Sequence, residues 1–255
     1  MNITYIGGPT ALIEWGGLRI LTDPSLDPAG AVYQFGGYAL KKTCASALRP
    51  EQLGRVDLVL LSHDHHKDNL DDTGRAFLPI AGRVITTPAA AERLGANATG
   101  LAEWQTVEVP APGMRVLRIT ATPARHGPAG QDRGPVTGFI LTPSNDEKAA
   151  VYISGDTVWY EGVAEVARRF PAIRTVILFM GAAQVDAVGP FHLTMTAEEA
   201  VEAARAFSAA TIVPLHYEGW AHFRESRLFI NGVFRNAGIE NRLHWMELGK
   251  TITVE

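Results

Sequence analysis

The sequence "LSHDHHKDN" at residues 61–69 concentrates the chemistry of this chain. It holds three histidines within four positions, two aspartates, and an asparagine directly after the second aspartate. Neutral imidazole and carboxylate are the usual ligands of catalytic divalent metals. The apolar run "VDLVLLS" (56–62) leads into it and is typical of a strand that is buried on both faces. We therefore expect a metal site just past the end of a buried strand.

Composition limits the partners of the chain. Its 255 residues, 46% of them hydrophobic, can bury a full core, and we expect one domain over residues 1–255. The net charge of -4 and the lack of a long Lys/Arg run argue against a nucleic-acid partner. The longest apolar runs are too short to span a bilayer, and the N-terminus does not have the pattern of a secretory signal. We expect a cytoplasmic protein without membrane insertion, with a homo-oligomer left open.

Cysteine usage restricts the metal chemistry further. Cys44 is the only cysteine, which excludes an intrachain disulfide and any all-thiolate site. A bound metal must therefore rely on histidine, aspartate and glutamate.

The pattern along the chain predicts strands and helices in two strand-rich halves. The first segment indicates antiparallel hairpins broken by glycine pairs, and residues 24–50 indicate a long loop. The last third alternates helix and strand, with a Thr N-cap before the helix in 194–207. These features predict a sandwich of two sheets with helices outside. Further strands are expected in 105–110, 114–124, 136–143, 149–156, 175–181 and 211–217, and helices in 70–80, 89–95, 162–170 and 226–238.

Three further candidate ligands each follow an extended run, as His63 does. They are His126 in "TPARHGP", Asp156 in "ISGDT" and His216 in "VPLHYEGW". Each motif alone is common in loops and turns. Strands that end at one edge of a sheet would bring these side chains together, and this convergence is the main indication of a metal site. His192 lies just before a predicted helix start.

The chain resembles the metallo-β-lactamase-fold hydrolases, especially the branch of ascorbate-phosphate lactonases and N-acylphosphatidylethanolamine phospholipase D. The resemblance covers nearly the whole chain, through "ILTDP", "VDLVLLSHDHHKDNLD", "TPARH", "ISGDT", "HLTMTAEEA" and "IVPLHY" in the family's order. It implies an α+β fold, a four-layer αββα sandwich, with one or two metal ions at its edge.

The family's His-x-His-x-Asp-His motif transfers to this chain with one residue too many. His63 matches the first histidine, because "DLVLLS" precedes it, and Asp68 matches the aspartate, because "LD" follows shortly after it. Either His65 or His66 is the second ligand. We favour His66, because it keeps the two-residue step to Asp68.

The resemblance also implies roles for the remaining residues. His126 would complete the set of the first metal, and Asp156 would bridge two metals. His216 would hold the second metal together with Asp68. His192 would contact substrate or act as general acid. Asp23 in "LTDP" would either orient a ligand from behind or serve only as a turn residue.

Asn69 departs from the motif, which usually has a histidine there as a ligand of the second metal. An amide oxygen is a weaker ligand for zinc than an imidazole. The second site is therefore expected to be weak, to prefer a harder ion such as manganese, or to be empty.

We expect metal-assisted hydrolysis of an ester, lactone or phosphodiester bond in a small substrate. Zinc is the first candidate for the divalent metal, with manganese and iron as alternatives. Asp68 and His192 are the predicted catalytic residues. A di-iron redox protein and a regulatory protein with a degraded second site are the alternative functions. The pocket wall is predicted to include Tyr38, Tyr217, Trp220 and His222, with a core position an equal alternative for the aromatic residues.

Overall fold

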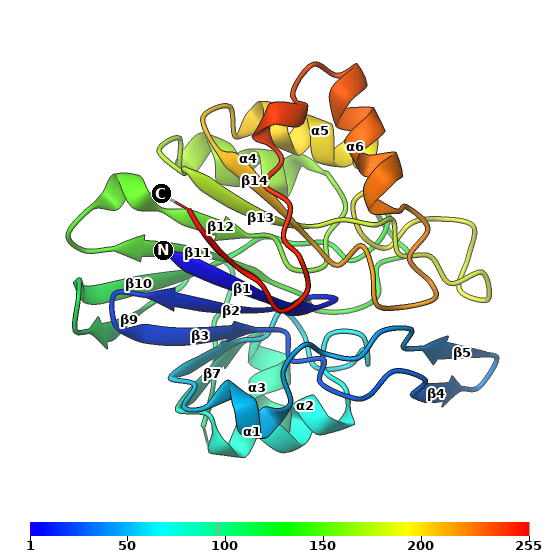
Figure 1. The fold of residues 1–255 in the computed structure, drawn as a ribbon, viewed down its shortest axis with the longest axis horizontal. Helices are drawn as coiled ribbons and strands as arrows, with labels where there is room; N and C mark the ends of the chain where they lie inside the picture. The colour runs from blue at the N-terminus through cyan, green and yellow to red at the C-terminus, as the bar shows by residue number, and fades with distance from the viewer. Residues whose placement is uncertain (96, 255) are drawn as a thin grey trace.

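Two sheets stacked face to face form the centre of the fold in the computed structural model, which describes residues 1–95 and 97–254 (Figure 1). The first sheet has seven strands in the order β15-β1-β2-β3-β6-β7-β8. Their bounds are Asn2–Gly7 (β1), Thr10–Trp15 (β2), Leu18–Thr22 (β3), Leu58–Leu60 (β6), Arg83–Thr86 (β7), Ala98–Gly100 (β8) and Thr251–Thr253 (β15).

The second sheet has six strands in the order β14-β13-β12-β11-β10-β9. Strands β12, β13 and β14 are parallel, and β10 runs in the same direction because β11 is antiparallel to both β10 and β12. The carboxyl ends of β10, β12, β13 and β14 therefore lie at one edge. The bounds are Thr106–Ala111 (β9), Arg115–Thr122 (β10), Gly138–Pro143 (β11), Val151–Ile153 (β12), Thr175–Phe179 (β13) and Thr211–Leu215 (β14).

Three hydrophobic cores separate four layers. The central core joins the inner faces of both sheets, for example Ile20 of β3 with Phe139 of β11 and Phe179 of β13. Alternate residues of β13, such as Val176, face the other side and pack against the helices over the second sheet. A third core covers the outer face of the first sheet. The predicted αββα sandwich is confirmed.

Helices cover the two outer faces, and Figure 1 shows α4–α6 on one side and α1–α3 on the other. Helix α5 begins where the sequence predicts, because Thr196 accepts a hydrogen bond from the Glu199 amide and Glu199 bonds back to the Thr196 amide. The bounds are Pro50–Leu53 (α1), Asp72–Phe77 (α2), Leu78–Ile80 (η1), Pro88–Leu94 (α3), Glu147–Ala149 (η2), Glu161–Arg169 (α4), Ala197–Ala206 (α5), Arg227–Asn236 (α6) and Glu240–Arg242 (η3). Within the described ranges, no helix is long and apolar enough to cross a membrane.

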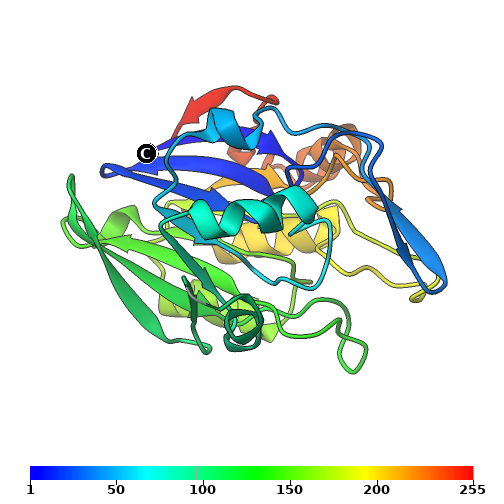
Figure 2. The same ribbon diagram turned by 90° about the horizontal axis from the view of Figure 1, so that it is seen from below.

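The prediction of an irregular loop over residues 24–50 was wrong. Strands β4 (Val32–Phe35) and β5 (Tyr38–Lys41) pair there as an antiparallel hairpin that extends beyond the sheets (Figures 1 and 2). Two glycines form its turn, and the rings of Phe35 and Tyr38 stack across it with their centroids 5.1 Å apart. Strand–Gly-Gly–strand spacing was the signal that could have identified the hairpin.

Candidate metal centre

The ends of four strands bring the candidate ligands together. The stretch 63–69 follows β6 of the first sheet, while His126, Asp156 and His216 follow β10, β12 and β14 of the second. All three of these side chains and His63 are buried. The convergence expected from the sequence is therefore present in the fold.

The first group of ligand atoms consists of three imidazoles. His66 Nδ1 lies 2.9 Å from His63 Nε2 and 3.0 Å from His126 Nε2. A single proton on Nδ1 can serve only one of these contacts at a time, whereas one cation accepts all three lone pairs. Asp156 Oδ2 lies 3.5 Å from His126 Nε2 and adds a carboxylate to the group. We name His63, His66, His126 and Asp156 the first cluster.

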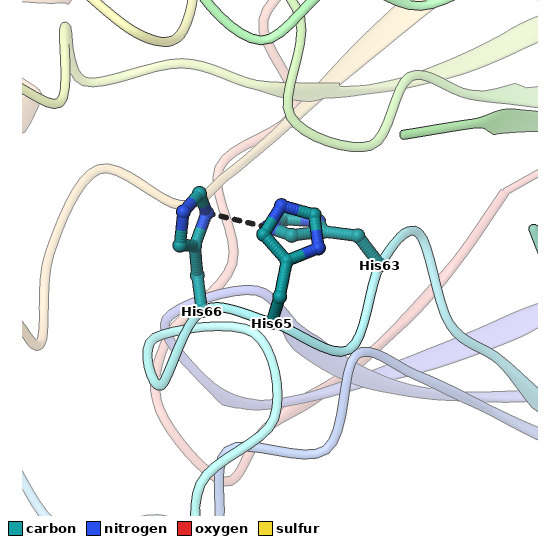
Figure 3. Close-up of side chains that lie close together, drawn as sticks. All are labelled: His63, His65 and His66. Carbon is teal, nitrogen blue, oxygen red and sulfur yellow. Dashed lines mark hydrogen bonds between the residues drawn. The ribbon is translucent and has the colours of Figure 1, made fainter. Parts of the chain in front are cut away.

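His66, rather than His65, faces the other members of the first cluster. Figure 3 shows His66 linked to His63, with His65 beside them. His65 Nε2 instead makes a 2.7 Å hydrogen bond with the Arg133 carbonyl. The nitrogens of His63, His65 and His66 still lie within 4.8 Å of one another and could hold an ion. The contact with His126 favours His66, because three imidazoles then converge on one point.

The second group shares Asp156 with the first. His216 Nε2 lies 3.5 Å from Asp156 Oδ1 and 3.4 Å from Asp68 Oδ2. His222 reaches the same Asp68 oxygen, with its Nε2 at 3.0 Å. We name Asp68, Asp156, His216 and His222 the second cluster.

Asn69 is fully buried between the two clusters. Its Nδ2 donates a 3.1 Å hydrogen bond to Asp156 Oδ1 and lies 3.5 Å from Ser62 Oγ. Asn69 Oδ1 has no hydrogen-bond partner among the described residues. The amide is thus a donor to the shared carboxylate.

The buried polar atoms fit a bound divalent metal. Asp156 Oδ2 and His216 Nε2 are buried and lack a hydrogen-bond partner within the part of the chain that the structure describes. Such atoms cost free energy unless a cation or a donor satisfies them. Ligands at about 2.0–2.1 Å around tetrahedral zinc lie about 3.3 Å apart, close to the spacings within the clusters.

Burial and neighbouring charges favour the protonation states that bind metal. Burial lowers the pKa of His63 and His66 well below the ordinary value, and neighbouring imidazoles lower each further. Burial raises the pKa of Asp68, but the imidazoles of His216 and His222 outweigh it and hold this pKa well below its usual range. Burial also lowers the pKa of His216, but the carboxylates of Asp156 and Asp68 outweigh it and raise the pKa. Neutral imidazoles at His63 and His66 and an ionised Asp68 are ready ligands.

Contacts from behind orient two of the imidazoles. Ser62 Oγ lies 2.9 Å from His63 Nδ1 and donates to Asp23 Oδ1 at 2.8 Å. His126 Nδ1 bonds to the Leu193 carbonyl at 2.8 Å, which leaves its Nε2 for the first cluster. Asp23 therefore reaches His63 through Ser62, the arrangement expected of an acid that supports a metal ligand.

Not every predicted site residue meets these clusters. Tyr217 is buried and packs edge-on against Trp245 in the core. Trp220 packs against Tyr33 and also meets the His222 ring of the second cluster edge-on, with centroids 6.0 Å apart. Among the described residues, His192 makes no hydrogen bond or ion pair with either cluster, and it interacts electrostatically with Glu199 and Glu225. Its role as general acid stays a prediction. Tyr38 and His222 do line the pocket beside the clusters.

The pocket beside both clusters is lined by apolar and charged residues. Tyr38 and Leu40 of the β4–β5 hairpin form part of its wall, and Arg133 also lines it. An adjoining cavity of 330 Å³ shares Tyr38, Leu40, Val185 and His222 with this pocket. The remaining apolar residues of the pocket are Ala183, Val185, Val188 and Leu193.

Comparison with known proteins supports this view of the chain. The family model of the beta-lactamase superfamily domain matches residues 18–217. A "UPF0173 metal-dependent hydrolase" of Ignicoccus hospitalis is 28% identical over 264 residues, with 100% of this chain and 98% of the relative covered. A protein of the same name from Pelotomaculum thermopropionicum is 29% identical over 237 residues, with 86% of each covered.

A solved structure is similar over the full length. The isothiocyanate hydrolase from Delia radicum gut bacteria has a TM-score of 0.84 and 26% identity, with 100% of this chain and 99% of that chain covered. These likenesses confirm the predicted fold and the predicted enzyme class. Because the family model matches well over half of its length, the chain belongs to the β-lactamase superfamily, as a metal-dependent hydrolase.

Proposed function

We propose that the protein hydrolyses an ester, lactone or phosphodiester bond of a small substrate with a pair of divalent metal ions. The observation that carries this proposal is the shared carboxylate. Asp156 offers one oxygen to His126 of the first cluster and the other to His216 of the second, at 3.5 Å each. A carboxylate whose two oxygens face two different groups of ligands is suited to bridge two ions, even though Oδ1 also accepts the Asn69 hydrogen bond.

His63, His66, His126 and Asp156 would hold the first ion, and Asp68, Asp156 and His216 the second. When bound, the metal supplies an activated water and polarises the bond under attack. Zinc is the first candidate, since imidazoles predominate in the first cluster, with manganese and iron as alternatives. Asp23 would keep His63 oriented through Ser62.

Asp68 is proposed as the residue that orients the attacking water and takes its proton. It is held ionised, and it lines the pocket as well as the second cluster. His192 is proposed as a substrate contact or general acid. It lies in the connection between β13 and α5, directly before the pocket residue Leu193.

The pocket supports a small substrate with an apolar part and an anionic or strongly polar group. Apolar residues of the wall would contact the apolar part, and Arg133, which also lines the pocket, would serve an anionic group. The adjoining 330 Å³ cavity is at the lower end of the usual size for small-molecule sites. A small lactone or phosphodiester fits these properties. The resemblance to the ascorbate-phosphate lactonase and phospholipase D branch favours the same substrates, in a cytoplasmic setting.

The experiment combines metal analysis with a substrate panel. Protein purified without added metal is analysed by mass spectrometry for zinc, manganese and iron, and then assayed on lactones, carboxylic esters, phosphodiesters and isothiocyanates. Isothiocyanates are included because the similar solved structure is named as an isothiocyanate hydrolase. We expect bound metal and turnover of at least one ester, lactone or phosphodiester, lost on chelation and restored by the metal.

The variants His126→Ala and Asp156→Ala test the ligand assignment. Each should lose metal and turnover together, while His244→Ala should keep both, because His244 lies after η3 and its amide bonds to Ile212 near the start of β14. Unchanged metal and turnover in His126→Ala and Asp156→Ala would refute the proposal. Iron with oxygen-dependent chemistry would instead establish the di-iron alternative, and absence of metal and turnover the regulatory one.

A further inference from the structure

The position that usually supplies a histidine to the second metal is occupied by an amide that is already engaged. Asn69 Nδ2 donates to Asp156 Oδ1 at 3.1 Å. The reverse amide orientation would place an oxygen against the carboxylate oxygen, which is repulsive. Asn69 therefore serves the shared carboxylate as a hydrogen-bond donor.

Another imidazole stands at the second cluster instead. His222 Nε2 lies 3.0 Å from Asp68 Oδ2, the same oxygen that His216 Nε2 approaches at 3.4 Å. The His222 side chain is 10% exposed, and its Nδ1 is buried without a partner in the described ranges. Two imidazole nitrogens thus approach one Asp68 oxygen, and Asp156 adds a second carboxylate beside His216.

The loop that carries His222 is fixed on both sides. The Gln184 amide donates to the His222 carbonyl at 2.9 Å, and the Ala221 amide donates to the Lys41 carbonyl at 3.0 Å. The His222 ring also contacts the Phe223 ring, with centroids 4.8 Å apart. A ligand on such a loop is positioned before metal binds.

We propose that His222 is a ligand of the second metal ion and replaces the motif histidine that Asn69 has displaced. The second ion would then bind Asp68, Asp156, His216 and His222, while Asn69 orients Asp156. This inference rests on the proposed two-metal function. It makes the second site complete, with its imidazole supplied by a loop 153 positions further along the chain than Asn69 (222 − 69).

A gain-of-signal experiment tests the ligand directly. The His222→Cys variant is loaded with cobalt(II), and thiolate-to-cobalt charge-transfer absorption is recorded during titration. We expect this band in His222→Cys, growing with the second equivalent of cobalt. Wild-type protein, whose exposed Cys44 is its only thiol, and His244→Cys should show no such band.

Metal counting provides the second, independent readout. Wild-type protein should hold two ions and His222→Ala one, while the double variant His222→Ala/Asn69→His should regain the second ion. Thermal unfolding of the metal-free variants checks that each is folded. His244→Ala is the matched control and should hold two ions.

The outcomes separate this inference from the proposed function. Two ions bound by His222→Ala with wild-type affinity, together with no charge-transfer band in His222→Cys, would overturn the His222 assignment and leave the hydrolase proposal standing. One ion in wild-type protein, held by the first cluster, would overturn it together with the two-metal form of the proposed function. No metal in wild-type protein would overturn both.

Discussion

The two halves of the proposed metal centre gather their candidate ligands in different ways. The first cluster takes His63 and His66 from one short stretch and His126 from the end of a strand. The second cluster has an amide at the motif position and a histidine from a distant loop beside Asp68. The first half therefore takes two of its imidazoles from the motif stretch, whereas one imidazole of the second half depends on how a distant loop is folded.

The extra residue in the motif is accommodated beside the first cluster. His65 turns its Nε2 to the Arg133 carbonyl, and His66 takes the place next to His63 and His126. The step from His66 to Asp68 keeps two residues, so the carboxylate still reaches the second cluster. The extra residue thus changes the position of the His65 side chain only, and His66 and Asp68 keep the spacing of the motif.

The largest effect is expected from the first cluster. His126→Ala removes the proposed ligand that follows β10, and we expect turnover to fall by at least about 1,000-fold, about 4 kcal/mol in the barrier. Steady-state kinetics and metal analysis of the same sample measure it. Turnover within a few-fold of wild type would show that the first cluster is not the reactive half.

Substitutions of residues that hydrogen-bond to the proposed ligands should weaken metal affinity by intermediate and similar amounts. Ser62→Ala removes the contact with His63 Nδ1, and Asn69→Ala removes the hydrogen bond to Asp156. Each should weaken metal affinity by about 10–100-fold, measured by competition with a chelating dye. We expect Asn69→Ala to weaken the affinity for the second ion more than the affinity for the first. Equal weakening of both affinities would mean that the two clusters do not bind metal independently.

Much of the fold could be predicted from the sequence, because strand ends and hydrophobic periodicity depend on nearby residues. The positions of His63, His126, Asp156 and His216 after strands followed from this, and the structure brings them together. The sandwich itself followed from two strand-rich halves and was made specific by the family resemblance.

The remaining parts of the site and of the fold depend on loop conformations, which the sequence does not predict. His222 lies six positions after His216, and no periodicity indicates that its loop turns back to Asp68 (222 − 216). The choice between His65 and His66 depended on the conformation of residues 63–69, which spacing alone leaves open. The β4–β5 hairpin was missed because its strands are half-exposed and lack an apolar stripe.

The variant Asp27→Asn tests whether metal binding by the two clusters depends on the contacts that anchor the chain after residues 63–69. Asp27 accepts hydrogen bonds from the amides of Asp72 and Thr73 at the start of α2, just after the stretch 63–69. Burial raises the pKa of Asp27, but hydrogen bonds from Thr73 and Tyr33 outweigh it and lower the pKa below its ordinary value. Asp27→Asn should lower the free energy of unfolding by about 1 kcal/mol at pH 7, with both ions retained.

The pH dependence of Asp27→Asn follows from the lowered pKa. A carboxyl group whose pKa is lowered in the folded state contributes its full stabilisation of that state when the pH is above the unfolded-state pKa, about 3.9 for aspartate. This contribution is lost as the pH falls through the folded-state pKa. The difference from wild type should be equal at pH 7 and pH 5 and shrink below about pH 4, in urea unfolding of metal-free protein. Loss of a metal ion from Asp27→Asn at pH 7 would show that metal binding depends on the hydrogen bonds that Asp27 accepts.

The smallest expected effect is a difference in metal preference between the two halves. Three of the four ligands in the first cluster are imidazoles, whereas two of four in the second are carboxylates when His222 is included. Imidazole suits zinc, and carboxylate suits manganese, so crystals grown with equal zinc and manganese should show a few-fold enrichment of manganese at the second site. Anomalous scattering at the two absorption edges measures the occupancies site by site. His222→Ala should increase the manganese share of any ion that remains at the second site, since it removes an imidazole. An identical zinc share at both sites in wild type would mean that the shared Asp156, rather than the differing ligands, sets the preference of the pair.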